Sequence, residues 1–276
     1  MTLLLPAALM LMQVGVNPTV GQVPGVPEEL RERPPRGAVA IDRAPARAAI
    51  DVCLDTARDD PARARDLAQE WVSRTTGAQR ATGRHCLGVA AGNAGDWPAA
   101  SAAFLAARDE ASEPRFRARM GALAGTALLA QDKPDDALAT LDTAMSEAAG
   151  DNVLGGEIQQ ERAVALVTLE RLPEASEALT EARRLSPQDA NAWLLSATLA
   201  RRQNDLASAQ SQIERAASLA HPGAAVGPAI GLEAGVIAAL GGRDAAARQS
   251  FESVIATAPE SEQASTAKTY LAQLKP

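Results

Sequence analysis

The chain of 276 residues carries a net charge of −7, and 46% of its residues are hydrophobic although only 3% are aromatic. A core with so few aromatic residues must be built from alanine and leucine, which favours closely packed helices. An acidic chain without clustered cations is unsuited to nucleic acid, because such binding depends on neutralising phosphates.

The amino terminus begins with an apolar stretch. Residues 3–16 are mostly leucine, alanine, methionine and valine, and the stretch is shorter than the roughly 20 residues that span a bilayer. It is similar to the apolar region of a secretory signal, although no Lys or Arg precedes Arg31. We interpret residues 1–16 as a signal-peptide-like segment and expect a protein of the periplasm or cell envelope. An uncleaved anchor, a disordered start and a cytoplasmic location are the alternatives.

The next segment, residues 17–44, is rich in proline and glycine and carries alternating charges. Such a segment buries too little apolar surface to order itself, and its prolines favour extended backbone. We interpret it as a disordered linker that precedes a folded domain over residues 45–276.

From residue 100 onward one pattern occurs five times: a small residue, a large apolar residue four positions later, and a smaller residue three further on. The copies are Ala100-Phe104-Ala107, Ala137-Leu141-Ala144, Ala175-Leu179-Ala182, Ala209-Ile213-Ala216 and Ala247-Phe251-Val254. Their first alanines are 37, 38, 34 and 38 residues apart, a period typical of stacked helical hairpins. Twelve residues before each lies another small residue: Gly88, Gly125, Ala163, Ala197 and Gly235. We expect each such pair to meet where the two helices of a hairpin cross.

Further residues carry a family resemblance. Leu87 precedes Gly88, Trp193 stands four positions before Ala197, and a proline follows several units, as Pro114 does. Together with the repeated pattern, these residues resemble the tetratricopeptide repeat (TPR), as in exported bacterial proteins of that family. The resemblance implies an all-α fold, a right-handed α-solenoid of about six hairpins with a C-terminal capping helix at 262–274. The units are expected near 45–78, 81–114, 118–151, 156–189, 190–223 and 228–261.

Two details of this arrangement follow from the spacing. The extra residues in the longer intervals equal about one helical turn, so we expect long helices around 108–127 and 145–170. Gly155-Gly156 is expected at a junction between units.

Cys53 and Cys86 are the only cysteines. They fall on the first helices of neighbouring units, where a disulfide is reasonable if the Cα atoms lie within about 7 Å. The alternative is that both are small buried apolar residues. We expect the disulfide, which also fits an exported protein.

No catalytic or metal-binding pattern is evident. The only histidines are His85 and His221, and His85 and its neighbour Cys86 would project from a helix in different directions. No cluster with zinc-ligand spacing and no phosphate-binding loop occurs in the sequence. We therefore expect neither an enzyme nor a cofactor or metal site.

The TPR resemblance implies that partners bind a concave groove lined by the first helix of each unit. Carried over by position, the expected partner-binding residues are Arg119, Thr126, Gln160, Val164, Asn191, Leu194, Thr198, Arg201 and Arg202. This lining is mixed and mildly apolar. The Lys and Asn clamp of one TPR subclass is missing, because its positions hold His85 and Val89, or Ala122 and Thr126.

We therefore expect a non-enzymatic scaffold that binds a peptide or helix of another protein, or a second copy of itself, in this groove. Nucleic acid is not an expected partner, and a membrane is expected to be contacted only through the N-terminal segment. The alternative is a small-ligand or glycan-binding accessory module of an envelope or polysaccharide system. Arg201 and Arg202 either favour the dipole at a helix end or hold a carboxylate of a bound peptide.

Overall fold

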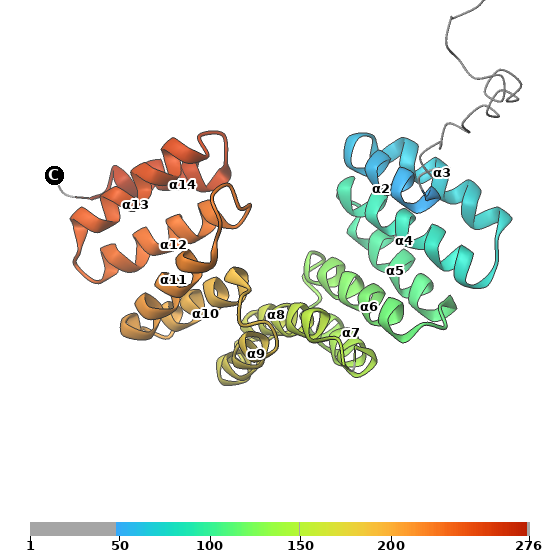
Figure 1. Ribbon diagram of the computed structural model, residues 1–276, viewed down its shortest axis with the longest axis horizontal. Helices are drawn as coiled ribbons and strands as arrows, with labels where there is room; N and C mark the ends of the chain where they lie inside the picture. Colours follow the sequence, from blue (N-terminus) through green and yellow to red (C-terminus); the bar gives the residue numbers. More distant parts are fainter. Residues whose placement is uncertain (1–47, 149, 275–276) are drawn as a thin grey trace, which may run out of the picture. The chain divides into compact units, whose positions relative to one another are not determined.

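The computed structural model describes residues 48–148 and 150–274, so the predictions for residues 1–16 and 17–44 lie outside the described part. Within that part the chain forms thirteen α-helices and no strand (Figure 1). The helices pair as α2 (Ala49–Asp59) with α3 (Pro61–Arg74), α4 (Gly77–Asn93) with α5 (Trp97–Glu110), α6 (Pro114–Leu129) with α7 (Pro134–Glu147), α8 (Asn152–Thr168) with α9 (Leu172–Leu185), α10 (Ala190–Arg202) with α11 (Leu206–Leu219), and α12 (Gly227–Leu240) with α13 (Asp244–Thr257). A final helix, α14 (Glu262–Leu271), packs against α13 and α12.

The prediction of an all-α array of about six hairpins with a C-terminal helix is confirmed. We call the first helix of each hairpin its A helix and the second its B helix. Each B helix packs on its own A helix and on the A helix that follows, so the core is continuous along the array. None of the helices in the described ranges combines the length and the apolar character needed to cross a membrane.

Each hairpin from α4–α5 onward turns at the same position, five residues before the first alanine of its repeated pattern. The residues at this position are Gly95, Asp132, Glu170, Asn204 and Gly242, with φ angles of 76°, 58°, 59°, 62° and 70°. This left-handed conformation ends the A helix, and glycine and asparagine adopt it most readily. The side chains of Asp96 and Asp205 then accept hydrogen bonds from Ala99 and Ser208 at the start of the B helices.

From α4–α5 onward, the small residue of the A helix lies under the large apolar residue of its B helix. A Cβ atom added to Gly88 would lie 2.5 Å from Cε1 of Phe104, and one added to Gly125 would lie 2.6 Å from Cγ of Leu141. The expected meeting of two small residues, Gly88 and Ala100, is therefore wrong. Gly92, one turn further along α4, faces Ala100 instead, with a separation of 4.0 Å from an added Cβ to the alanine Cβ.

The expected helices around 108–127 and 145–170 are interrupted. Residues 111–113 separate α5 from α6, and residues 148–151 separate α7 from α8. Glu113 and Asp151 cap the new helices, because their carboxylates accept hydrogen bonds from backbone N–H groups of Phe116 and Leu154. The extra residues lengthen α6 and α8, which have 16 and 17 residues against 13 in α10.

The expected junction at Gly155-Gly156 lies inside α8, where both glycines are buried. A Cβ added to Gly155 would lie 3.2 Å from Cδ1 of Leu185, and one added to Gly156 would lie 2.6 Å from Oγ of Ser186. The two glycines thus let α8 approach the end of α9.

One contact of the hairpins changes its chemistry along the array. Arg80 pairs with Glu110 between α4 and α5, with Nε 2.8 Å from Oε2. At the same repeat position Arg117 pairs with Glu147 between α6 and α7, with Nη2 2.6 Å from Oε1. In the next hairpin this position is the apolar contact of Gly155 with Leu185.

Candidate partner-binding site

A pocket of about 250 Å³ opens between the A helices α8 and α10. It is lined by Ala163, Val164, Val167 and Thr168 of α8, Leu179 of α9, and Leu195, Thr198, Leu199 and Arg202 of α10. The residues from α10 are spaced i, i+3, i+4 and i+7, so they share one helix face. Val164 is 38% exposed and lies at the opening. The pocket therefore offers an apolar floor with two hydroxyls and one guanidinium.

The contact between α8 and α10 differs from three other contacts between neighbouring A helices, each of which carries a disulfide or an ion pair. A disulfide joins α2 to α4, and an ion pair between Arg119 and Glu157, at 3.5 Å, joins α6 to α8. A closer pair, Arg201 with Glu233 at 2.6 Å, joins α10 to α12. Between α8 and α10 a polar network links only one end of the helices.

Gln160 and Asn191 form that network. The Gln160 Nε2 donates to Oδ2 of Asp189 at 2.7 Å, and Nδ2 of Asn191 donates to Oε1 of Gln160 at 2.7 Å. Gln160 is only 5% exposed. Its amide is used within the protein and holds α8 against α10 beside the pocket.

Leu194 and Arg201 lie away from the pocket. Leu194 is buried in a cluster that includes Ile230 and Ile237 of α12. The guanidinium of Arg201 is held by Glu233, whose side chain is 12% exposed. Arg202, in contrast, lines the pocket, and it forms no ion pair within the described residues.

Arg119 and Thr126 lie on α6, also outside the pocket. Arg119 is exposed and pairs with Glu157, and the Thr126 hydroxyl donates to the carbonyl of Ala122 at 3.2 Å. Of the nine expected partner-binding residues, the structure brings Val164, Thr198 and Arg202 together in the pocket. Leu195 and Leu199 were missed, although their spacing with Thr198 and Arg202 on one helix face could have indicated them.

His85 has the environment of a packing residue. It lies between the rings of Phe104 and Phe116, with centroid distances of 6.4 and 6.0 Å. Burial, and then the charge of Arg119, lowers the pKa of His85 to about 4. The ring is neutral near pH 7. Across the described residues, no group of three or more His, Cys, Asp or Glu side chains is placed to hold a metal ion.

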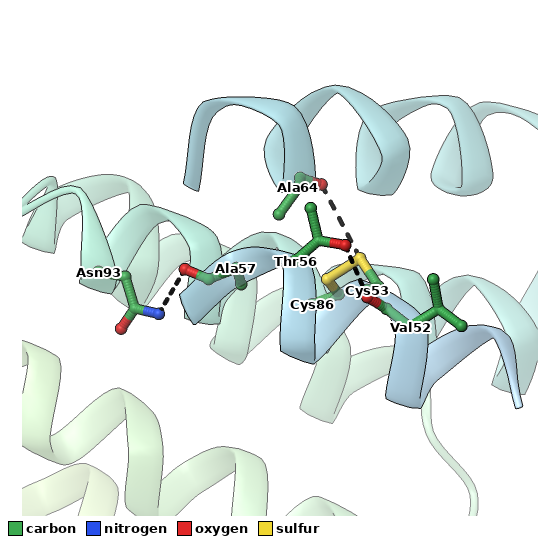
Figure 2. The surroundings of a disulfide bond; sticks show 7 residues. All are labelled: Val52, Cys53, Thr56, Ala57, Ala64, Cys86 and Asn93. Carbon is green, nitrogen blue, oxygen red and sulfur yellow. Dashed lines mark hydrogen bonds between the residues drawn. A yellow bond between two sulfur atoms is a disulfide. The ribbon is translucent and has the colours of Figure 1, made fainter. Parts of the chain in front are cut away.

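The cysteines lie on neighbouring A helices, as Figure 2 shows. Cys53 of α2 and Cys86 of α4 form a disulfide with Cα atoms 6.1 Å apart. Asn93 of α4 also reaches α2, because its Nδ2 donates to the carbonyl of Ala57 at 2.8 Å. The first hairpin is thus tied to the second through its A helix.

No family model and no curated protein matches this sequence. Solved structures do match. PilW, described as a type IV pilus biogenesis factor, superposes with a TM-score of 0.63 at 15% identity, over 81% of this chain and 100% of that one. The Pseudomonas aeruginosa protein PilF gives 0.59 at 14% identity, over 80% and 97% of the two chains. TTC0263 from Thermus thermophilus, described as a TPR protein, gives 0.56 at 19% identity, over 70% and 98%.

These likenesses at low identity establish the architecture. The part of the chain that the structure describes has the tetratricopeptide-repeat fold.

Proposed function

We propose that this protein is a non-enzymatic interaction scaffold that binds a segment of another protein in the pocket between α8 and α10. One observation carries the proposal: this pocket is an apolar opening between neighbouring A helices, and its one guanidinium has no ion-pair partner in the described part of the chain. Its volume of about 250 Å³ suits one or two aliphatic side chains.

The occupant we propose is an extended or helical peptide with an aliphatic side chain next to a carboxylate. Burying a leucine or valine side chain contributes roughly 1.5–3 kcal/mol. A carboxylate can pair with Arg202 in a bidentate, charge-assisted contact. The Thr168 hydroxyl donates to the carbonyl of Val164 at 3.0 Å, so it can still accept a hydrogen bond from a peptide N–H, and Thr198 can accept or donate one. The apolar contact supplies affinity, and the guanidinium selects acidic peptides.

We propose residues 1–16 as an export signal, residues 17–44 as a linker and residues 45–276 as the binding domain, in the periplasm or cell envelope. The disulfide supports this location, because disulfides persist mainly in oxidising compartments. PilF and PilW share the fold, and PilW is described as a factor in pilus biogenesis. N-terminal sequencing of the protein from a fractionated cell tests the location. An intact residue 1 in the cytosolic fraction would overturn it.

A peptide-display experiment tests the site. A library of random peptides with free carboxyl termini is selected on the parent protein, and the affinities of the selected peptides are then measured for variants. We expect the selected peptides to combine an aliphatic residue with an adjacent acid. Val164→Glu should weaken their binding more than about tenfold, since it places a charge in the apolar opening.

The matched control is Val153→Glu, the same substitution at a 63% exposed valine of α8 outside the pocket. It should leave binding unchanged. Arg202→Ala should weaken the binding of acidic peptides and reduce its dependence on salt concentration. Peptides that bind Val164→Glu as well as the parent protein would show that the pocket is not the binding site.

A further inference from the structure

The first hairpin lacks the large apolar residue that the other hairpins use. In every hairpin the first alanine of the pattern lies three residues after the start of the B helix, which makes Ala64 of α3 the equivalent of Ala100. Four residues later the other hairpins have Phe104, Leu141, Leu179, Ile213 and Phe251, whereas α3 has Ala68. The buried residues of α2 and α3 are Cys53, Ala57, Ala64 and Ala68, all of them small.

The disulfide occupies the corresponding space. Cys53 and Cys86 are 3% and 0% exposed, and they form one buried cluster with Ala68. Figure 2 shows the two sulfur atoms between α2 and α4, with Ala64 of α3 close to Cys53. The bond therefore packs against Ala68, the residue at the position that Phe104 and Leu141 occupy in later hairpins.

Helix α3 packs on α4 as the later B helices pack on the A helices that follow them, but its buried side chains are only those of Ala64 and Ala68. The amide of Asn93 reaches the carbonyl of Ala57, and the side chains of Trp71 and Val72 cover Gly83 of α4. Val52 and Leu67 are 45% and 39% exposed, so they contribute little burial. In a repeat array each unit is stabilised mainly by its neighbours, and a terminal unit has only one.

We propose that the Cys53–Cys86 bond is what keeps the first hairpin folded, so that reduction releases α2 and α3 from α4 while α4 to α14 remain folded. The first hairpin then completes its structure only where the disulfide can form. This inference does not depend on the partner-binding site, which lies between α8 and α10.

The redox step is a thiol–disulfide exchange with a dithiol reductant. A thiolate of the reductant attacks one cysteine sulfur and forms a mixed disulfide, and the other cysteine leaves as a thiolate that takes up a proton. The second thiol of the reductant then displaces the bound cysteine. Two electrons and two protons reach the protein, and the reductant becomes a cyclic disulfide. A pocket of about 530 Å³ between α2 and α3, lined in part by Val52, Cys53 and Leu67, gives a small dithiol its approach.

Hydrogen–deuterium exchange with mass spectrometry tests the inference on the full chain, before and after dithiothreitol treatment. Alkylation of the freed thiols confirms that reduction is complete. We expect the amides of α2 and α3 to exchange on the order of 10²–10³-fold faster after reduction, the effect that closing a loop of this length has in the chain-entropy model. Amides of α6 to α13 should change less than about twofold, because local openings are confined to cooperative units.

Cys53→Ala and Cys86→Ala should each behave like the reduced protein, since either substitution removes the bond. As a control for fraying at an array end, Ala264→Gly removes a buried methyl group from α14 and should accelerate exchange only near the C-terminus. Unchanged protection of α2 and α3 in the fully alkylated protein would overturn the inference. Loss of protection throughout α6 to α13 would overturn it as well.

Discussion

The guanidinium of Arg201 donates to both carboxylate oxygens of Glu233, at 2.6 and 3.3 Å, and so ties α10 to α12. Arg202 follows it directly in the sequence but lines the pocket between α8 and α10. Successive residues of a helix differ in direction by about 100°, which separates the two roles. One arginine joins two hairpins, and the other faces the pocket.

The two arginines should therefore have different effects on stability. Arg201→Ala leaves the carboxylate of Glu233 poorly solvated and without its partner, which should lower the free energy of unfolding by about 1–3 kcal/mol. Arg202→Ala should change it by less than about 0.5 kcal/mol, as expected for a surface residue. Urea unfolding of both variants, followed by circular dichroism, measures the difference. Equal losses would show that the contact with Glu233 is not stabilising.

Two glycines of α4, one helical turn apart, should respond in opposite ways to alanine. Gly88→Ala places a methyl group 2.5 Å from the ring of Phe104 and should cost about 1–3 kcal/mol through overpacking. Gly92→Ala meets atoms only at 3.5 Å and beyond, and should stabilise by about 0.5–1 kcal/mol because alanine is the better helix former. Thermal unfolding of the two variants gives the sign. A stable Gly88→Ala protein would mean that α4 and α5 are not packed this closely.

The turn at Glu170 contains strain that glycine should relieve. Glu170 has a φ of 59°, whereas the same turn position holds glycine in two other hairpins. A non-glycine residue in the left-handed conformation costs roughly 1–2 kcal/mol. Glycine avoids this cost, but it loses more conformational entropy on folding, which offsets part of the benefit. Glu170→Gly should therefore raise the free energy of unfolding by about 0.5–1 kcal/mol. Glu177→Gly, at an exposed position within α9, should lower it by about 1 kcal/mol, and calorimetry of both variants checks the contrast.

Stability should fall as the pH drops from 6.5 towards 4, in part because of His85. Burial, followed by the charge of Arg119, lowers the pKa of His85 to about 4 from an ordinary value of 6.5. Between these values the unfolded chain binds a proton that the folded chain excludes, so unfolding becomes easier by up to about 1.4 kcal/mol per pH unit. Above pH 6.5 this slope diminishes, because the unfolded chain loses its proton as well.

His85→Gln should flatten this dependence between pH 5 and 7, which urea midpoints at several pH values would measure. Burial raises the pKa of Glu161, which gives a slope of the opposite sign, but this slope is common to the variant and the parent protein. If the variant keeps the slope of the parent, another group is responsible.

The repeat spacing predicted the hairpins because it records a local requirement. A small residue in the A helix and a large one in the B helix must recur at fixed distances if the units are to stack. Spacing could not show which side chains meet, and Gly88 faces Phe104 rather than Ala100. The turn at Glu170 was equally hidden, since glutamate gives no local signal for a left-handed residue.

The site was predicted less completely than the fold. Carrying positions over from the TPR pattern assumes that every A helix presents the same face to a partner. In this chain α12 packs on α10 and covers Leu194, and Glu233 engages Arg201. The pocket, in contrast, keeps Val164, Thr198 and Arg202 together. The other side chains that line it from α8, α9 and α10 are mostly aliphatic. Those pairings join residues far apart in the sequence and depend on how neighbouring hairpins pack.

The array has two kinds of contact at one repeat position. It is an ion pair in two hairpins, Arg80 with Glu110 and Arg117 with Glu147, and the apolar contact of Gly155 with Leu185 in the next. Dissolved ions weaken attraction between charges, whereas excluded salts such as sulfate strengthen the burial of apolar groups. Concentrated sulfate therefore weakens this one contact in α4–α5 and α6–α7, while it strengthens the apolar packing of all three hairpins. The cooperativity of unfolding in this array is thus a property of the solvent as well as of the chain.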